Sequence, residues 1–376
     1  MFYEKLKLIE EKKLLRKIKD KSSPQGSIIV LNNRKFINFA SNDYLGISNN
    51  PFIISNAIKA LEKFGAGSGA SRLLAGGVEL HGELERKIAK FKNTPSALIF
   101  NSGYAANTGI IPALFDNDFL ILSDELNHAS IIDGCRLSKA ETKIYKHKDI
   151  EHLEKLLKIK NKKQKIVITD SVFSMDGDIA PLDKIYELCK KYNALLYIDD
   201  AHGTGVLGKG KGALSHFRLK PDSWIIQMGT FSKALGSYGA FLAGSKDVIK
   251  LALNTARTFI FSTALPAYTI AASLAAIELI EKDTSLIEKL WKNRKKVVSS
   301  LSILGFDLMN TETPIIPLKM KDIDEAIHLS VKLFKKGIYA PAIRPPTVKE
   351  PRLRITVTAA HTDKDIETLI DALKKA

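Results

Sequence analysis

Cysteine is scarce in this chain of 376 residues, which contains only Cys135 and Cys189. Two cysteines cannot build a disulfide framework, and these two form neither a C-x-x-C pair nor a zinc cluster. We therefore expect no metal site, and a reducing cytoplasm is the expected location. The first 20 residues are too rich in charge to contain the apolar stretch of a signal peptide.

Uninterrupted apolar runs are also rare. The uncharged stretches 93–115 and 258–277 are long enough to cross a bilayer. Pro112 interrupts the first and Pro266 the second, and each stretch is better interpreted as a buried strand followed by a helix. We predict no membrane-spanning segment.

Acidic residues are outnumbered, with 41 against 57 basic residues and a formal net charge of +16. Such an excess is typical of nucleic-acid-binding proteins, but only 11 of the 57 basic residues are arginine. The lysines are spread over the predicted surface helices without interleaved aromatic residues, so we expect no nucleic-acid partner. A basic nucleic-acid-binding protein remains the alternative from a different class, and retention on heparin without visible absorbance would favour it.

Short apolar runs alternate with helix-length segments from about residue 50 onwards. The runs lie at 97–100, 119–122, 165–169, 194–198 and 224–228. This alternation predicts an α/β fold with parallel strands and crossover helices. Short strands at 315–318, 338–340 and 353–357 and a last helix from Asp363 predict a small C-terminal α+β domain.

We expect three segments in all. An N-terminal segment covers residues 1–48, a large cofactor-binding domain covers 49–280, and the small domain covers 281–376. Within the first segment, apolar residues at helical spacing predict an amphipathic helix over 3–19. Two runs joined by Asn32 and Asn33 predict a short hairpin.

Polar residues follow five of the predicted strands, at the edge of the sheet where α/β proteins bind ligands. These segments are 101–107, 124–130, 170–178, 197–205 and 229–236. Alone, each could be an ordinary turn. Together they offer a lysine for a carbonyl (Lys233), a carboxylate for a ring nitrogen (Asp199 or Asp200) and a helix N-terminus for a phosphate. A pyridine aldehyde phosphate needs these groups, so we predict pyridoxal 5'-phosphate as the cofactor.

Longer motifs agree with this interpretation. They include SNDYLG at 41–46, GSGASR at 67–72, VFSMDG at 172–177, DDAHGTG at 199–205 and TFSK at 230–233. Through them the chain resembles, nearly end to end, the α-oxoamine synthases, which are pyridoxal-phosphate enzymes. The resemblance implies the aspartate-aminotransferase-like fold (fold type I), in which a large domain with a mainly parallel sheet is joined to a small C-terminal domain. It also implies a homodimer.

The resemblance assigns a role to each matching residue. Catalysis is implied for Lys233, His128, Asp199 and His202, with Lys233 holding the cofactor and moving the α-proton of the substrate. The residues implied to bind the cofactor are Gly103, Tyr104, His128, Ser174, Asp199, His202, Thr230 and Lys233. Those implied to bind substrate are Arg16, Asn42, His128, Thr347 and Arg354, with Arg354 clamping the amino-acid carboxylate.

One segment narrows the choice of substrates. AIRPPTV at 342–348, followed by RLRIT at 352–356, is most similar to family members that condense L-alanine with pimeloyl-CoA or pimeloyl-acyl carrier protein. Members that use glycine are the nearest alternative, and an aminotransferase could share the fold. The lysine-rich surface could attract either anionic carrier.

Overall fold

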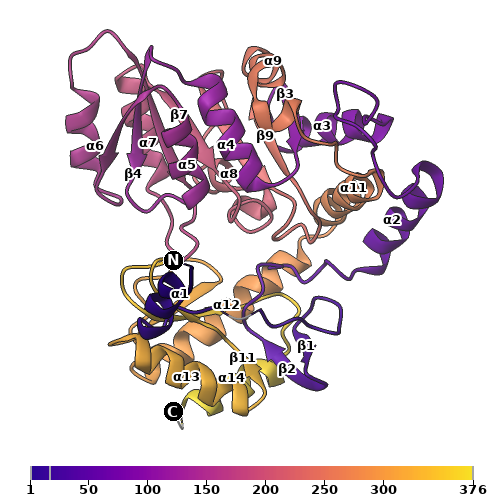
Figure 1. The fold of residues 1–376 in the computed structure, drawn as a ribbon, viewed down its shortest axis with the longest axis vertical. Helices are drawn as coiled ribbons and strands as arrows, with labels where there is room; N and C mark the ends of the chain where they lie inside the picture. Colours follow the sequence, from indigo (N-terminus) through magenta and orange to yellow (C-terminus); the bar gives the residue numbers. More distant parts are fainter. Residues whose placement is uncertain (1, 17, 375–376) are drawn as a thin grey trace. The chain divides into compact units, whose positions relative to one another are not determined.

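The chain divides into two compact units in the computed structural model, which describes residues 2–16 and 18–374. The larger unit contains residues 47–174 and 179–287, and the smaller combines 1–46, 175–178 and 288–376. Unlike the expected division at 48 and 280, this grouping joins the N-terminal segment to the C-terminal residues. Figure 1 shows β1 and β2, drawn in indigo, beside the orange and yellow C-terminal elements of the same unit.

A seven-stranded sheet forms the centre of the larger unit, with strand order β3-β9-β8-β7-β6-β4-β5. Its strands are β3 (Ser96–Phe100), β4 (Phe119–Asp124), β5 (Glu141–Tyr145), β6 (Gln164–Asp170), β7 (Leu195–Asp199), β8 (Ile225–Thr230) and β9 (Ala240–Gly244). β9 runs antiparallel to both of its neighbours, β3 and β8, and the other strand pairs of this sheet are parallel. The predicted mainly parallel α/β sheet is therefore confirmed.

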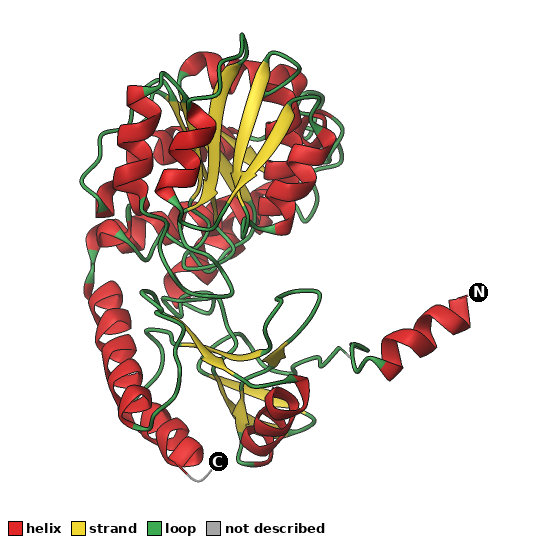
Figure 2. Ribbon diagram, turned by 90° about the vertical axis from the view of Figure 1, so that its left-hand side faces the viewer, coloured by secondary structure: helices red, strands yellow, loops and turns green. Residues whose placement is uncertain are grey.

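Helices cover both faces of this sheet, as Figure 2 shows. The helices of the larger unit are α2 (Pro51–Phe64), α3 (Glu79–Phe91), α4 (Gly103–Leu114), α5 (Ala129–Leu137), α6 (Ile150–Leu157), α7 (Leu182–Lys191), α8 (Ala213–His216), α9 (Lys246–Thr255), α10 (Arg257–Ile260) and α11 (Ala267–Lys282), with a 3-10 turn at Gly208–Gly210. The core packs apolar side chains of α4, such as Ile110 and Ile111, against strand residues such as Ile168 and Met228. None of the helices within the described residues has both the length and the apolar character needed to cross a bilayer.

Two strands of the sheet were not predicted. β9 has the sequence AFLAG, whose small residues suit the fully buried position between β3 and β8 but give no β-branched signal. β5, ETKIY, is an edge strand whose side chains are mostly exposed, so it lacks the apolar run by which the other strands were found.

Two three-stranded sheets, ordered β1-β2-β11 and β10-β13-β12, build the smaller unit. Its elements are α1 (Phe2–Glu11), β1 (Ile28–Leu31), β2 (Arg34–Asn38), most of α12 (Ser285–Ile303), β10 (Ile315–Lys319), α13 (Ile323–Lys335), β11 (Ile338–Tyr339), β12 (Ala342–Ile343), β13 (Arg352–Thr356) and α14 (Asp363–Lys374). The predicted hairpin is confirmed: Asn32 and Asn33 both have positive φ, at 49° and 60°, as a tight two-residue turn requires.

The predicted N-terminal helix is shorter than expected, because α1 ends at Glu11 rather than near residue 19. Lys13 adopts φ 56°, and the amide of Leu14 reaches back to the carbonyl of Ile9. Such a left-handed residue closes a helix, and the helical spacing of apolar residues beyond it could not reveal this ending. Residue 17 lies outside the described residues.

His361 fixes the N-terminal segment to the core of the smaller unit. Its ring stacks on Phe39 at 4.2 Å, its Nε2 lies 3.1 Å from the carbonyl oxygen of Asn38, and its Nδ1 accepts the amide of Thr358 at 2.9 Å. Both ring nitrogens are therefore used by a neutral imidazole. Burial lowers the pKa of His361 from 6.5 to about 4.

We expect this unit to lose stability as the pH falls from 6.5 to 4. In that range the unfolded chain binds a proton at His361 that the folded chain does not bind. The free energy of unfolding therefore falls by up to about 3 kcal/mol. Urea unfolding in a Trp224→Phe background, followed by the fluorescence of Trp291, measures this unit. His361→Gln should flatten the slope, whereas substitution of the exposed His216 should not. An unchanged slope in His361→Gln would contradict the assignment.

Candidate active site

The carboxyl ends of β3, β4, β6, β7 and β8 meet at one edge of the larger unit's sheet, because these strands are mutually parallel. The segments that follow them enclose a cavity of about 180 Å³. Its lining residues are Gly103, Tyr104, His128, Ser130, Asp170, Asp199, Ala201, His202, Met228, Thr230, Ser232 and Lys233. Seven of the eight residues predicted to bind the cofactor thus line one cavity. Ser174, the last residue before 175–178, does not line it.

Lys233 lies three residues beyond β8, in a turn closed by the hydrogen bond from the amide of Gly236 to the carbonyl of Lys233, at 2.9 Å. The side chains of Phe231 and Leu235 on either side of it are fully buried. They anchor the turn, so that Lys233 is left half-buried on the wall of the cavity.

Asp199 is the last residue of β7, and only 3% of it is exposed. Its Oδ2 accepts a hydrogen bond from Asn107 Nδ2 at 2.8 Å, and its Oδ1 accepts the amide of Ala201 at 2.9 Å. Burial raises the pKa of Asp199, while the charge of Lys233 opposes this shift. A carboxylate held in this way favours a cationic partner that arrives with a ligand.

His128 is the N-cap of α5 and lines the same cavity. Its Nδ1 lies 2.8 Å from the hydroxyl of Ser130, and its amide donates to Asp170 Oδ2 at 2.7 Å. Desolvation lowers the pKa of His128, an effect that Asp199 opposes and Lys233 reinforces. The ring is therefore held neutral beside the two charged groups.

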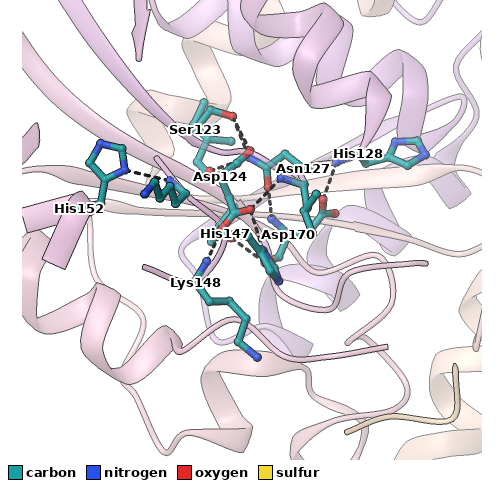
Figure 3. A network of polar contacts seen from close by, with 12 residues as sticks. Ser123, Asp124, Asn127, His128, His147, Lys148, His152 and Asp170 are labelled. Carbon is teal, nitrogen blue, oxygen red and sulfur yellow. Dashed lines mark hydrogen bonds and ion pairs between the residues drawn. The ribbon is translucent and has the colours of Figure 1, made fainter. Parts of the chain in front are cut away.

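A network of polar contacts fixes the segment that carries His128, as Figure 3 shows. Asn127 donates to the hydroxyl of Ser123 at 2.9 Å and to the carbonyl of Ile168 at 2.8 Å, and its Oδ1 accepts the amide of Asp170 at 2.8 Å. In the same network His147 Nδ1 lies 2.9 Å from Asp124. The carboxyl ends of β4 and β6 are thus tied together by side chains.

The N-terminus of α4 provides a place for an anion. Ser102 caps the helix by accepting the amide of Ala105 at 3.1 Å, so the amides of the first helical residues, Gly103 and Tyr104, point outwards. A Cβ at position 103 would lie 2.8 Å from Thr230 Cγ2. Only glycine therefore allows Thr230, 3% exposed, to lie this close to the helix end.

These residues fit a pyridoxal phosphate. The cavity offers an amine, a buried carboxylate for a protonated ring nitrogen, a flat imidazole and helix amides for a phosphate. His202, 7% exposed, also lines it. The donor set contains each group that this cofactor requires.

Arg354 belongs to the smaller unit, where it lies on β13 and is 7% exposed. Its Nη2 donates to Asn42 Oδ1 at 3.0 Å, and it also bonds Tyr44, whose pKa burial raises to about 12. Arg352, on the same face of the strand, is neutralised instead by Asp176 at 2.5 Å. The structure therefore brings together two of the predicted substrate residues, Arg354 and Asn42.

Two further predicted substrate residues, Arg16 and Thr347, also lie in contact, and the fifth, His128, lines the cavity of the larger unit. Arg16 Nη2 donates to the hydroxyl of Thr347 at 3.1 Å, and Arg344 secures the segment by donating to the carbonyl of Leu15 at 2.9 Å. These residues line a cleft of about 580 Å³ within the smaller unit, together with Lys19. The lining contains three cationic side chains, Arg16, Lys19 and Arg344, against the one carboxylate of Glu10, so the cleft is suited to an anionic ligand.

Comparison with known proteins adds to the geometry. Residues 34–373 match the family model described as aminotransferase class I and II. A protein of Thermodesulfovibrio yellowstonii that is provisionally named an 8-amino-7-oxononanoate synthase is 55% identical over 99% of this chain and 96% of its own length. The 8-amino-7-oxononanoate synthase of Thermoanaerobacter pseudethanolicus is 46% identical over 99% of this chain and 95% of its own.

Solved structures give the same result. Serine palmitoyltransferase from S. paucimobilis, with a bound PLP–myriocin aldimine, is similar with a TM-score of 0.93 and 29% identity, over 100% of this chain and 96% of that one. The 8-amino-7-oxononanoate synthase of Francisella tularensis gives a TM-score of 0.79 and 29% identity, over 90% and 97%. The resemblance to the α-oxoamine synthases, the fold type and pyridoxal phosphate as cofactor are thereby confirmed.

Proposed function

The chain belongs to the aminotransferase class I and II family, and we propose that it catalyses the decarboxylative condensation of L-alanine with a pimeloyl thioester in biotin synthesis. A bond forms between the alanine Cα and the thioester carbonyl carbon, the carrier thiol leaves, and the alanine carboxyl group is lost as carbon dioxide. The observation that carries this proposal is the 55% and 46% identity, over 99% of the chain, to relatives named 8-amino-7-oxononanoate synthase.

Pyridoxal phosphate, when bound, supplies an electron sink for the negative charge that develops at the alanine Cα. Lys233 Nζ would hold the cofactor covalently, and as a free amine it would take the proton from the alanine Cα and later return one. Asp199 keeps the ring nitrogen protonated, which its buried carboxylate can do by pairing with that cation.

The remaining cavity residues position the cofactor and the acyl group. Gly103, Tyr104 and Thr230 would receive the phosphate, and His202 would bond the 3-oxygen side of the ring. The resemblance assigns Ser174 to the same side of the ring, although Ser174 does not line the cavity. His128, which lines the cavity, would lie against the ring, and its neutral imidazole would polarise the thioester oxygen as the new bond forms.

Arg354 receives the alanine carboxylate, with Asn42 orienting the guanidinium. A planar, buried arginine suits this task because it binds a carboxylate through two parallel hydrogen bonds. The pair of Arg16 and Thr347 contacts the acyl thioester, and the cationic cleft around the pair suits the anionic groups of coenzyme A or of an acyl carrier protein.

Arg354→Lys should raise the KM for alanine by about ten- to one-hundred-fold while changing the KM for the thioester little. Lysine keeps the charge but cannot donate two parallel hydrogen bonds to one carboxylate. Steady-state kinetics with each substrate varied in turn measures the effect. Arg352→Lys, on the same face of β13, is the matched control and should leave the KM for alanine unchanged. A wild-type KM in Arg354→Lys would contradict the assigned role.

A homodimer is part of the proposal. Large apolar side chains are exposed on the larger unit, where Leu74 is 81% and Phe261 is 70% exposed. The bridge between Ser71 and Thr263 holds their two segments together. Such a patch is suited to contact a second copy.

Mass spectrometry of the reaction products tests the function as a whole. Alanine, glycine and serine are each paired with pimeloyl, acetyl and succinyl thioesters, on coenzyme A and on acyl carrier protein. We expect 8-amino-7-oxononanoate from alanine and a pimeloyl thioester as the dominant product. A dominant product from glycine would assign the chain to another α-oxoamine synthase. Transfer of an amino group without a thioester would overturn the proposal in favour of an aminotransferase.

A further inference from the structure

Asn107 lies in the second turn of α4 and is completely buried. Each polar atom of its side chain has a partner: Nδ2 donates to Asp199 Oδ2 at 2.8 Å and to the Ser130 hydroxyl at 2.9 Å, and Oδ1 accepts from Tyr197 OH at 2.7 Å. Three residues far apart in the sequence are thus joined by one amide. Both donors of this amide are therefore already used within the protein.

The orientation of this amide follows from its neighbours. Burial raises the pKa of Tyr197 well above its usual value, so the phenol keeps its proton and donates it to Oδ1. In the opposite orientation the amide oxygen would lie 2.8 Å from the carboxylate of Asp199, where two acceptors repel each other. The two amide protons therefore point at Asp199 and Ser130.

The direction of the next hydrogen bond follows in turn. Because the Ser130 hydroxyl accepts from Asn107, its own proton is available for His128 Nδ1, 2.8 Å away. The amide of Ser130 points at the same nitrogen, at 3.3 Å. His128 Nδ1 is consequently an acceptor on both counts, and the proton of the neutral ring lies on Nε2.

We propose that Asn107 is a positioning residue that sets two cofactor contacts at once, orienting the carboxylate of Asp199 and, through Ser130, fixing His128 as the neutral Nε2–H tautomer. Both groups line the cofactor cavity, whereas Asn107 does not. The proposal rests on the cofactor contacts of the proposed function but does not depend on which amino acid or thioester reacts.

Two variants separate the two arms of this arrangement. Asn107→Leu keeps the branched shape and the number of heavy atoms of the side chain, in a larger volume, but removes both donors, so it should affect Asp199 and His128 together. Ser130→Ala breaks only the arm to His128 and leaves the bond from Asn107 to Asp199 in place. Asn293→Leu is the matched control, because Asn293 is also a buried asparagine whose Nδ2 donates twice, to the carbonyls of Thr358 and His361 at 3.0 Å each, in the smaller unit.

Binding of pyridoxal phosphate to the apoprotein, followed by visible absorbance, is the first readout. Asn107→Leu should weaken binding by about ten- to one-hundred-fold, the value of a hydrogen bond to a charged group. Asn293→Leu should stay within about threefold of the wild type, and Ser130→Ala, which keeps the bond from Asn107 to Asp199, should lose less affinity than Asn107→Leu. Wild-type affinity in Asn107→Leu would overturn the proposal, as would an equal loss in Asn293→Leu.

The second readout is the tautomer of His128 in the apoprotein, from nitrogen NMR of ring-labelled histidine assigned with a His128→Gln variant. The wild type should show Nδ1 without a proton, and both Asn107→Leu and Ser130→Ala should shift the ring towards a mixture of tautomers. A protonated Nδ1 in the wild type would overturn the proposal. Neither readout requires turnover, so a different product in the mass spectra would change the proposed function and leave this inference standing.

Discussion

Lys233→Ala is expected to abolish product formation, with a loss of turnover of at least about 10²- to 10⁴-fold, because the variant lacks both the covalent anchor and the proton carrier. The wild-type protein should be yellow, and its absorbance should change when L-alanine is added. The variant should not form the covalent link that gives this colour.

Borohydride reduction makes this prediction specific to one lysine among 46. In the wild type, reduction should attach the cofactor permanently to the peptide that contains Lys233, as peptide mass spectrometry would reveal. Lys220→Ala, at an exposed lysine of the same unit, is the control and should behave as the wild type. Covalent attachment elsewhere in the chain, or a colourless wild type that pyridoxal phosphate does not restore, would contradict the assignment.

Lys92→Ala is expected to destabilise the larger unit by about 3–5 kcal/mol, the cost of leaving a buried charge without its partner. Lys92 Nζ lies 2.7 Å from Asp200 Oδ2, and the two side chains are only 1% and 2% exposed. The ammonium also donates to the hydroxyl of Thr204 at 3.2 Å and to the carbonyl of Lys211 at 2.9 Å. All three of its protons are therefore used.

The carboxylate of Asp200 is enclosed by further hydrogen bonds. Its Oδ1 accepts from Ser171 at 2.8 Å and from the amide of Ala213 at 3.1 Å. A Cβ on Gly212, where φ is 100°, would lie 1.8 Å from Oδ2, so the chain closes tightly around the carboxylate.

Thermal and urea unfolding of the larger unit measure this effect, with Trp224 as the only tryptophan in a Trp291→Phe background. The matched control is Lys63→Ala: Lys63 and Glu79 are also 2.7 Å apart, but their side chains are 65% and 61% exposed. That variant should change the midpoints little. Lys92→Met combined with Asp200→Asn should recover part of the loss, because it removes both charges. Equal midpoints for Lys92→Ala and Lys63→Ala would contradict the prediction.

The gathering of the proposed cofactor residues around one cavity could be predicted because each follows an apolar run, and parallel strands bring their carboxyl ends to one edge. Lys233, Asp199 and His128 were found in this way. The residues that hold these side chains in place by hydrogen bonds could not be predicted. Asn107 lies 92 residues from Asp199, within an unremarkable helix, and only the fold shows that the two touch.

The buried position of Lys92 could not be predicted either, because lysine is so common in this chain. In a chain with 46 lysines, a lysine at the end of a helix carries no signal that separates a buried ion pair from a solvated charge.

The assignment of the four residues 175–178 to the smaller unit could not be predicted from the sequence either. Gly177 accepts the amides of Glu312 and Thr313, a contact that joins this short segment to residues more than 130 positions away.

The discontinuous smaller unit has a consequence for synthesis on the ribosome. In one sheet of this unit β2 pairs with β11, so that Ile37 lies opposite Ile338. In the other sheet the central strand, β13, ends at Thr356. The N-terminal 46 residues must therefore wait, without their partners, until nearly the whole chain has been translated, whereas the larger unit is complete by Ile287. We infer that the cofactor-binding unit folds first, while the nascent N-terminus is exposed to chaperones and proteases for most of elongation.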